Sequence, residues 1–338
     1  MARLVLHIGT HKTATTTIQD MFAHNADLLA QHGLIYPRLG RFSGHHGLVM
    51  DWNRLHPAYA LPGGSRAALQ SLVAAHAGAE GTVFLSSEEF SRGRPGGRVD
   101  FAELRALLAP FDEIAVICVL REQWQFIQSV YLEIAKSKPP PKPPALVETA
   151  IAESHVDGLW TDYNLLYDHL LTAFAPEEIT FLDFAAMRAH PGGVVGAMLE
   201  TLGTGLAAGA LEPVNGGLSN PSPPALPAWA AALIAEPKVA PPWLVAAAVE
   251  AFRIEFGLEA ASCLFSRAEY RQLDAHFAAA NARLAARHAA VQPGFAIGRT
   301  PLPEEADTRL VFRNAIGGKF WHRCTRTLFR ATEPAMRS

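Results

Sequence analysis

The sequence predicts an α/β fold: a doubly wound parallel sheet with helices on both faces, followed by a mainly helical C-terminal part. Apolar runs of strand length recur through the first 205 residues, and segments with helical periodicity separate them. These runs lack the alternation of a half-exposed strand, which indicates strands covered on both sides. Beyond residue 227 the chain is rich in alanine and its periodicity is mostly helical.

The predicted elements follow one another along the N-terminal half. Residues 3–9 are an apolar strand, and Ile18, Met21 and Phe22 then open the apolar face of a helix. A short strand over 33–37 ends at a proline, because proline lacks the N–H group that a strand ladder needs. Later strands are expected at 82–90, 114–120 and 178–184, and helices at 67–77, 101–108, 123–136, 145–153, 161–174 and 193–202.

Composition divides the chain near residue 205. Residues 1–205 form the predicted core, and the proline-rich segment 138–144 is an extended loop or a mobile lid inserted into it. Residues 206–338 form a mainly helical extension that is expected to pack on the core, with helices at 243–256 and 266–288. Proline, glycine, asparagine and serine mark the start of this extension.

Overall charge and cysteine content exclude several classes of partner. The 338-residue chain has a net charge of −3, so neither nucleic acid nor an anionic membrane is an expected partner. Its three cysteines, Cys118, Cys263 and Cys324, are far apart and predict neither a disulfide framework nor a metal site. No segment has the length and apolar character of a membrane span or a signal sequence, so we expect a cytoplasmic protein.

The turn after the first strand predicts an anion site. N–H groups at a helix N-terminus have no partner inside the helix, and the helix dipole there favours negative charge. Lys12 adds a positive charge to this turn, and four threonines add hydroxyl donors. A nucleotide triphosphatase loop has glycine directly before its lysine and Ser/Thr directly after it. His11 precedes Lys12, which comes too early in the loop, so ATP or GTP hydrolysis is disfavoured.

The order strand, His11-Lys12-Thr13-Ala14-Thr15-Thr16-Thr17, helix resembles the 5′-phosphosulfate loop of sulfotransferases that use 3′-phosphoadenosine-5′-phosphosulfate (PAPS). Ala14 stands where the family usually has glycine, and Thr17 stands where cytosolic members have an aromatic residue. The loop is therefore more similar to that of bacterial, carbohydrate-type members. The resemblance implies a P-loop NTPase-like α/β fold, and PAPS binding by His11, Lys12, Thr13, Ala14, Thr15, Thr16 and Thr17.

A second motif matches the same family. Arg121 follows a core strand, and Ser129 lies about two helical turns later, which is similar to the 3′-phosphate site of sulfotransferases. A guanidinium group binds phosphate oxygens in a forked geometry, and a hydroxyl supplies a further hydrogen bond. Ligands of open α/β sheets also collect at the carboxyl ends of strands. The resemblance therefore implies that Arg121 and Ser129 bind the 3′-phosphate of PAPS.

A glutamate is expected as the catalytic base. In carbohydrate-type members a glutamate at the end of the preceding strand commonly takes the acceptor's proton, and Glu88 stands at that position here. Alternation along a strand sends Glu88 and Glu89 to opposite faces, so Glu88 is the first choice and Glu89 the second. His45 and His46, in the long 40–66 loop, are expected to be solvated; lining an acceptor pocket is the alternative.

These motifs predict a sulfotransferase that moves a sulfuryl group from PAPS to a hydroxyl or amine of a small acceptor. The acceptor is expected to be a carbohydrate, and 3′-phosphoadenosine-5′-phosphate (PAP) is the product. Lys12 would also neutralise charge on the bridging oxygen. No metal is expected, since no carboxylate cluster suits Mg²⁺. Two alternatives stay open: a kinase or nucleotide hydrolase, and a non-catalytic nucleotide- or glycan-binding protein of the same fold.

Asn215 resembles an asparagine before the C-terminal helices of bacterial relatives.

Overall fold

The computed structural model describes residues 1–93, 97–214, 222–300 and 310–332, so Asn215 lies outside the described residues. Contacts divide the chain into two compact units that interleave along the sequence. Unit 1 contains Met1–Glu122, Asp157–Asn220 and Ala278–Gly298, and unit 2 contains Gln123–Val156, Pro221–Phe277 and Arg299–Ser338. Composition predicts a boundary near 205, whereas the contacts group residues 123–156 with the C-terminal helices.

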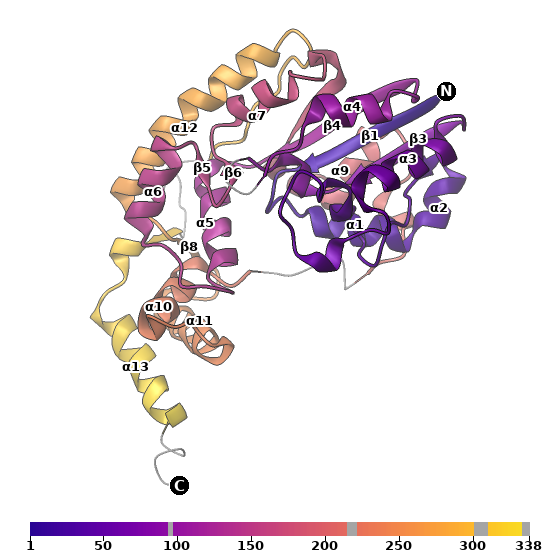
Figure 1. Cartoon of the computed structure of the whole chain (residues 1–338). Coiled ribbons are helices and arrows are strands. Elements are labelled where there is room, and N and C mark those ends of the chain that lie inside the picture. The colour runs from indigo at the N-terminus through magenta and orange to yellow at the C-terminus, as the bar shows by residue number, and fades with distance from the viewer. Residues whose placement is uncertain (94–96, 215–221, 301–309, 333–338) are drawn as a thin grey trace. The chain divides into compact units, whose positions relative to one another are not determined.

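Unit 1 is built on a five-stranded sheet in the order β2-β3-β1-β4-β7. Figure 1 labels its strands β1, β3 and β4. All four strand pairs are parallel, and β1 lies between β3 and β4. The strands are β1 (Ala2–Gly9), β2 (Leu34–Ile35), β3 (Gly81–Ser86), β4 (Glu113–Leu120) and β7 (Ile179–Asp183). Parallel strands need crossover connections, and a helix follows each strand. The predicted α/β fold with a parallel sheet is confirmed.

Side chains of β1 alternate between two separate apolar cores. Leu4, Leu6 and Ile8 pack on one face with α3 (Gly64–His76), α4 (Phe101–Leu108) and α7 (Tyr163–Leu170). Val5 packs on the other face with α1 (Thr15–His24), α2 (Ala26–Gln31), α8 (Phe184–Ala189) and α9 (Gly193–Thr201). The period of two along a strand produces this division. Helices therefore cover both faces of the sheet, which is the predicted doubly wound arrangement.

Strand β3 ends four residues earlier than the sequence predicts. It stops at Ser86, and residues 88–91 form the 3₁₀ helix η3 (Glu88–Ser91). The hydroxyl of Ser87 accepts the N–H of Glu89 at 3.2 Å and so caps this turn. The expectation that strand alternation sends Glu88 and Glu89 to opposite faces was therefore wrong, because neither residue belongs to the strand.

Within the described residues of unit 1 there are four further 3₁₀ helices and a short strand. The 3₁₀ helices are η1 (His46–Val49), η2 (Pro57–Tyr59), η4 (Pro176–Glu178) and η5 (Ala208–Ala210), and the strand is β6 (Leu159–Trp160). The first two lie within the segment 40–66, which the sequence predicts to be one long loop. The segment 40–66 therefore contains regular turns and is not one irregular loop.

Unit 2 is mainly helical, as predicted for the C-terminal part. Its elements are α5 (Gln123–Ile134), α6 (Pro143–Ala152), β5 (His155–Val156), α10 (Ala225–Ala235), α11 (Pro242–Phe256), β8 (Ala261–Cys263), the first turns of α12 (Arg267–His288), β9 (Leu310–Phe312), η7 (Arg313–Ala315) and α13 (Gly318–Thr332). Leu226, Leu244, Phe252 and Phe320 form its core. Helix α6 begins inside the proline-rich segment, since proline is tolerated in the first turn of a helix.

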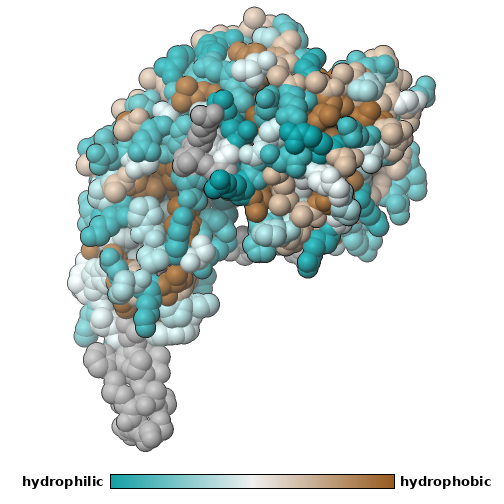
Figure 2. Space-filling model, in the orientation of Figure 1, coloured by the Kyte–Doolittle hydropathy of each residue, from teal (hydrophilic) through white to brown (hydrophobic). Residues whose placement is uncertain are grey.

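Side chains of different hydropathy share the molecular face drawn in Figure 2, where hydrophilic and hydrophobic side chains are interspersed. Among the described residues, no helix combines the length and the apolar character needed to cross a lipid bilayer.

Candidate active site

The carboxyl ends of the five parallel strands lie along one edge of the sheet, where open α/β sheets bind ligands. The strand order therefore determines which side chains are neighbours along this edge. Following β2, β3, β1, β4 and β7, they are Tyr36, Glu88, Lys12, Arg121 and Phe184. Glu88, Lys12 and Arg121, which are predicted to act on substrate, thus follow three adjacent strands.

The turn between β1 and α1 has the backbone of an anion site. Gly9, Lys12 and Ala14 have positive φ angles of 73°, 63° and 58°, and from His11 to Thr15 the sign of φ alternates from residue to residue. Alternation of this kind turns successive N–H groups toward a common concavity. Among the described residues, no acceptor binds the N–H groups of Thr13, Ala14, Thr15 and Thr16. These four donors are therefore available for an anion.

The threonine hydroxyls of this turn divide into two groups. Thr13 donates its hydroxyl to the carbonyl of Thr10 at 2.6 Å, and Thr10 binds the carbonyl of Val119 through both its N–H and its hydroxyl. Thr17 is buried, and its N–H donates to the carbonyl of Ala14 at 3.0 Å. These groups hold the turn in shape. The side chain of Thr16 is exposed at the start of the helix.

Arg121 joins the end of β4 to the same turn. Its Nη1 donates to the carbonyl of Lys12 at 2.9 Å, and its guanidinium carbon lies 5.0 Å from the centroid of the Phe184 ring. The hydroxyl of Tyr163 donates to the Arg121 carbonyl at 2.6 Å. Burial lowers the pKa of Arg121 to about 10, so the guanidinium stays charged at pH 7. Ser129 is a buried residue of α5, in unit 2.

Glu88 packs directly against the anion turn. A Cβ atom at Gly9 would lie only 2.8 Å from the Cβ of Glu88, so these two backbones approach closely where glycine is required. The amide of Gln19 donates to Glu88 Oε2 at 3.2 Å, and His46 Nδ1 lies 3.9 Å from the same oxygen. The carboxylate of Glu88 is thus held beside Lys12's turn by a neutral amide.

Glu89 has a different environment from its neighbour. Arg92 Nε donates to Glu89 Oε2 at 2.5 Å, and His11 Nε2 lies 3.3 Å from Glu89 Oε1. Burial alone would raise the pKa of Glu89, but the hydrogen bond from His11 and the charges of His11 and Arg92 lower it to about 2. The carboxylate of Glu89 therefore contacts both Arg92 and the ring of His11, which is a predicted PAPS ligand.

Two groups that contact the predicted site residues Glu88 and Arg121 were not predicted from the sequence. Gln19 is 1% exposed and donates to the Ser86 carbonyl at 3.2 Å as well as to Glu88. Its only sequence signal is a polar residue next to Ile18 on an otherwise apolar helix face. Phe184, which carries the guanidinium of Arg121, gives no signal because it is an ordinary apolar residue after a strand.

The expectation of solvated loop histidines was wrong. His45 is buried: its Nε2 donates to the Pro37 carbonyl at 2.7 Å, and its Nδ1 accepts the N–H of Ser86 at 2.9 Å. Its neighbour His46 is also largely covered, with Nδ1 2.9 Å from the hydroxyl of Ser87. Both histidines tie the 40–66 segment to the end of β3. Across the described part of the chain, no cluster of three or more metal-ligating side chains was found.

Ala14→Gly tests the conformation of the anion turn. Ala14 has φ 58° and ψ 27°, where a Cβ costs about 1–2 kcal/mol and glycine is unstrained. We expect the substitution to raise the free energy of unfolding by about 0.5–1 kcal/mol in urea titrations. Ala23→Gly, inside α1, is the control and should lower it by about 1 kcal/mol. Equal destabilisation by both substitutions would contradict the left-handed conformation.

A second test uses the buried, uncharged His45. Burial lowers its pKa from 6.5 to about 4, so between these pH values the unfolded chain binds a proton there and the folded chain does not. The free energy of unfolding should therefore decrease as the pH is lowered, by up to about 1.4 kcal/mol per pH unit from this residue. His45→Gln should reduce the slope by that amount in urea titrations at pH 6.5 and 4.5. An unchanged slope would show that His45 is protonated or solvated.

Comparisons with known proteins return few matches. No protein-family model matches the chain, and no curated protein matches it. Among solved structures, the chain is similar to a sulfotransferase from Alicyclobacillus acidocaldarius, with a TM-score of 0.41 and 16% sequence identity. That match covers 66% of this chain and 87% of the other.

Proposed function

We propose that the protein transfers a sulfuryl group from PAPS to a hydroxyl or amine of a small acceptor, with a carbohydrate as the preferred acceptor. The observation that carries the proposal is the hydrogen bond from Arg121 to the carbonyl of Lys12. It joins the two motifs that resemble the phosphosulfate and 3′-phosphate sites of sulfotransferases, although 109 residues separate them. A molecule with phosphate groups at both ends needs two such cationic groups within its own length.

The donor's two anionic ends have separate partners in this proposal. PAPS supplies the sulfuryl group and a phosphate leaving group. The ammonium of Lys12 and the N–H groups of Thr13, Ala14, Thr15 and Thr16 hold the 5′-phosphosulfate, because they form a concavity of donors with a positive charge. The guanidinium of Arg121 takes the 3′-phosphate, with Ser129 as the second predicted contact.

Glu88 acts as the base. It takes the proton of the acceptor hydroxyl while the acceptor oxygen bonds to sulfur, and the bond between sulfur and the bridging oxygen breaks. The electron pair of that bond stays on the bridging oxygen of PAP, where Lys12 neutralises the new charge. A preorganised charge of this kind contributes on the order of 3 kcal/mol. Glu89 is the weaker candidate, because Arg92 and His11 stabilise its charged form and lower its pKa to about 2.

The ratio of PAP to AMP affinity tests the donor site. PAP carries the 3′-phosphate and AMP does not, so wild-type protein should bind PAP at least about tenfold more tightly in calorimetry without Mg²⁺. Arg121→Lys should reduce this ratio toward one, since lysine cannot bind phosphate with a fork. Arg188→Lys is the control, because Arg188 also lies over Phe184, at 5.9 Å. Equal affinity for PAP and AMP, or a preference for Mg-ATP, would contradict the proposal.

Transfer of labelled sulfate tests the base. With ³⁵S-PAPS and a panel of glycosides, phenols and amines, Glu88→Gln should lower kcat by about 100-fold or more, since a general base contributes that much. PAP affinity should stay at the wild-type value, because the amide keeps the size of the carboxylate. Glu89→Gln is the matched control and should retain more activity. Full activity of Glu88→Gln would assign the base elsewhere, and loss of PAP binding would assign Glu88 to the donor site.

A further inference from the structure

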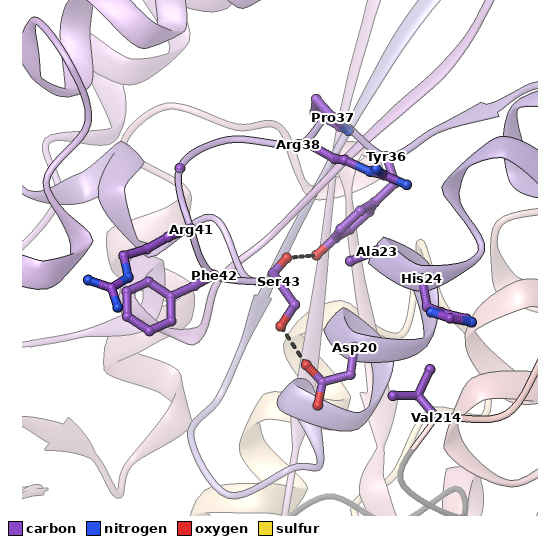
Figure 3. Close-up of a pocket in the computed structure, with 11 residues that line it drawn as sticks. Asp20, Ala23, His24, Tyr36, Pro37, Arg38, Arg41, Phe42, Ser43 and Val214 are labelled. Atoms are coloured by element: carbon purple, nitrogen blue, oxygen red, sulfur yellow. Dashed lines mark hydrogen bonds between the residues drawn. The ribbon is translucent and has the colours of Figure 1, made fainter.

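A cavity of about 500 Å³ lies in unit 1 between α1 and the segment that follows β2 (Figure 3). Cavities of this size hold small-molecule ligands. The side chains that matter here are Asp20, Tyr36, Arg38, Arg41, Phe42 and Ser43. In Figure 3, Tyr36 and Asp20 point toward Ser43 from opposite sides. The Tyr36 hydroxyl donates to the Ser43 carbonyl at 2.7 Å, and the Ser43 hydroxyl donates to Asp20 at 2.5 Å.

Two cations that line the cavity have no carboxylate partner among the described residues. Arg38 and Arg41 are exposed, and neither forms an ion pair with any described carboxylate. Arg41 instead lies 5.4 Å from the centroid of the Phe42 ring, which is 40% exposed. Elsewhere in unit 1, Arg66 and Arg105 each pair with glutamate or aspartate. Two exposed arginines that line one cavity, neither paired with a described carboxylate, suit an anionic ligand.

Aromatic contacts connect this cavity to the proposed base. The rings of Phe42 and Tyr59 lie 4.7 Å apart, and those of Tyr59 and His46 lie 4.9 Å apart. His46 Nδ1 is 3.9 Å from Glu88 Oε2. One wall of the cavity follows β2, and Glu88 follows the neighbouring strand β3. The other wall contains Asp20, Ala23 and His24 of α1, the helix that begins at the anion turn.

We infer that this cavity binds the acceptor, and that the acceptor is a sugar bearing an anionic group. Arg38 and Arg41 bind the anionic group, the Phe42 ring covers an apolar face of the sugar, and Asp20 and Ser43 offer partners for its hydroxyls. The inference rests on the proposed function, because it gives that reaction its acceptor.

A matched pair of sugars tests the inference. 4-Nitrophenyl β-D-glucuronide carries a carboxylate that 4-nitrophenyl β-D-glucoside lacks, and both carry the same hydroxyls otherwise. Ligand-observed NMR should give a Kd for the glucuronide at least about tenfold lower than for the glucoside. The double variant Arg38→Gln/Arg41→Gln should remove this difference, and PAP affinity should not change. Arg54→Gln, an exposed arginine of the same segment that does not line the cavity, should keep the difference.

The outcomes separate the two proposals. Equal affinity for the two sugars in the wild type, or an unchanged preference in the double variant, would overturn the anionic acceptor and leave PAP binding intact. Failure to bind PAP would overturn the proposed function, whatever the sugars do. With ³⁵S-PAPS, the double variant should raise KM for the glucuronide about tenfold without changing kcat, because these arginines touch no reacting atom. A loss of kcat alone would also contradict the inference.

Discussion

The hydrogen bond from Arg121 to the carbonyl of Lys12 is the contact on which the site depends. The turn after β1 contains two non-glycine residues, Lys12 and Ala14, in the left-handed region, which is unfavourable for each of them. External contacts must therefore hold it, and two of them come from the end of β4: Arg121 binds the Lys12 carbonyl, and the Val119 carbonyl accepts from Thr10. A hydrogen bond from a charged donor contributes about 1.5–3 kcal/mol, comparable to the strain of the turn.

A layer of neutral polar groups supports the carboxylate of Glu88. Gln19 Nε2 lies 3.3 Å from the hydroxyl of Ser86, which in turn lies 2.9 Å from His7 Nδ1. Burial lowers the pKa of His7 to about 3, so this histidine is uncharged at neutral pH. Glu88 is thus positioned by dipoles, and Glu89 is held by Arg92 and His11. The two adjacent carboxylates therefore differ in their partners: Glu88 accepts a hydrogen bond from an amide, and Glu89 is paired with cationic side chains.

The sequence predicts the elements far better than the surroundings of the site. Long apolar runs such as 114–120 identify strands reliably, because a buried parallel strand has no other simple reading. The end of β3 was misjudged, since the capping hydroxyl of Ser87 turns the chain before Glu88. The burial of His45 was also missed, because its two partners lie 8 and 41 residues away in the sequence. The strands β8 and β9 were also not predicted, because each has only three residues, too few to show a strand pattern.

The close approach of Gly9 to Glu88 links two loops through their main chains. With 2.8 Å available to a Cβ atom, even alanine at position 9 would force the loops apart, and its φ of 73° would add strain. The spacing between the Cβ of Glu88 and the anion turn is consequently a property of the backbone, which rotamer changes cannot adjust. A side chain at position 9 would therefore shift Glu88 relative to the anion turn that holds the sulfuryl donor, even in a protein that still folds.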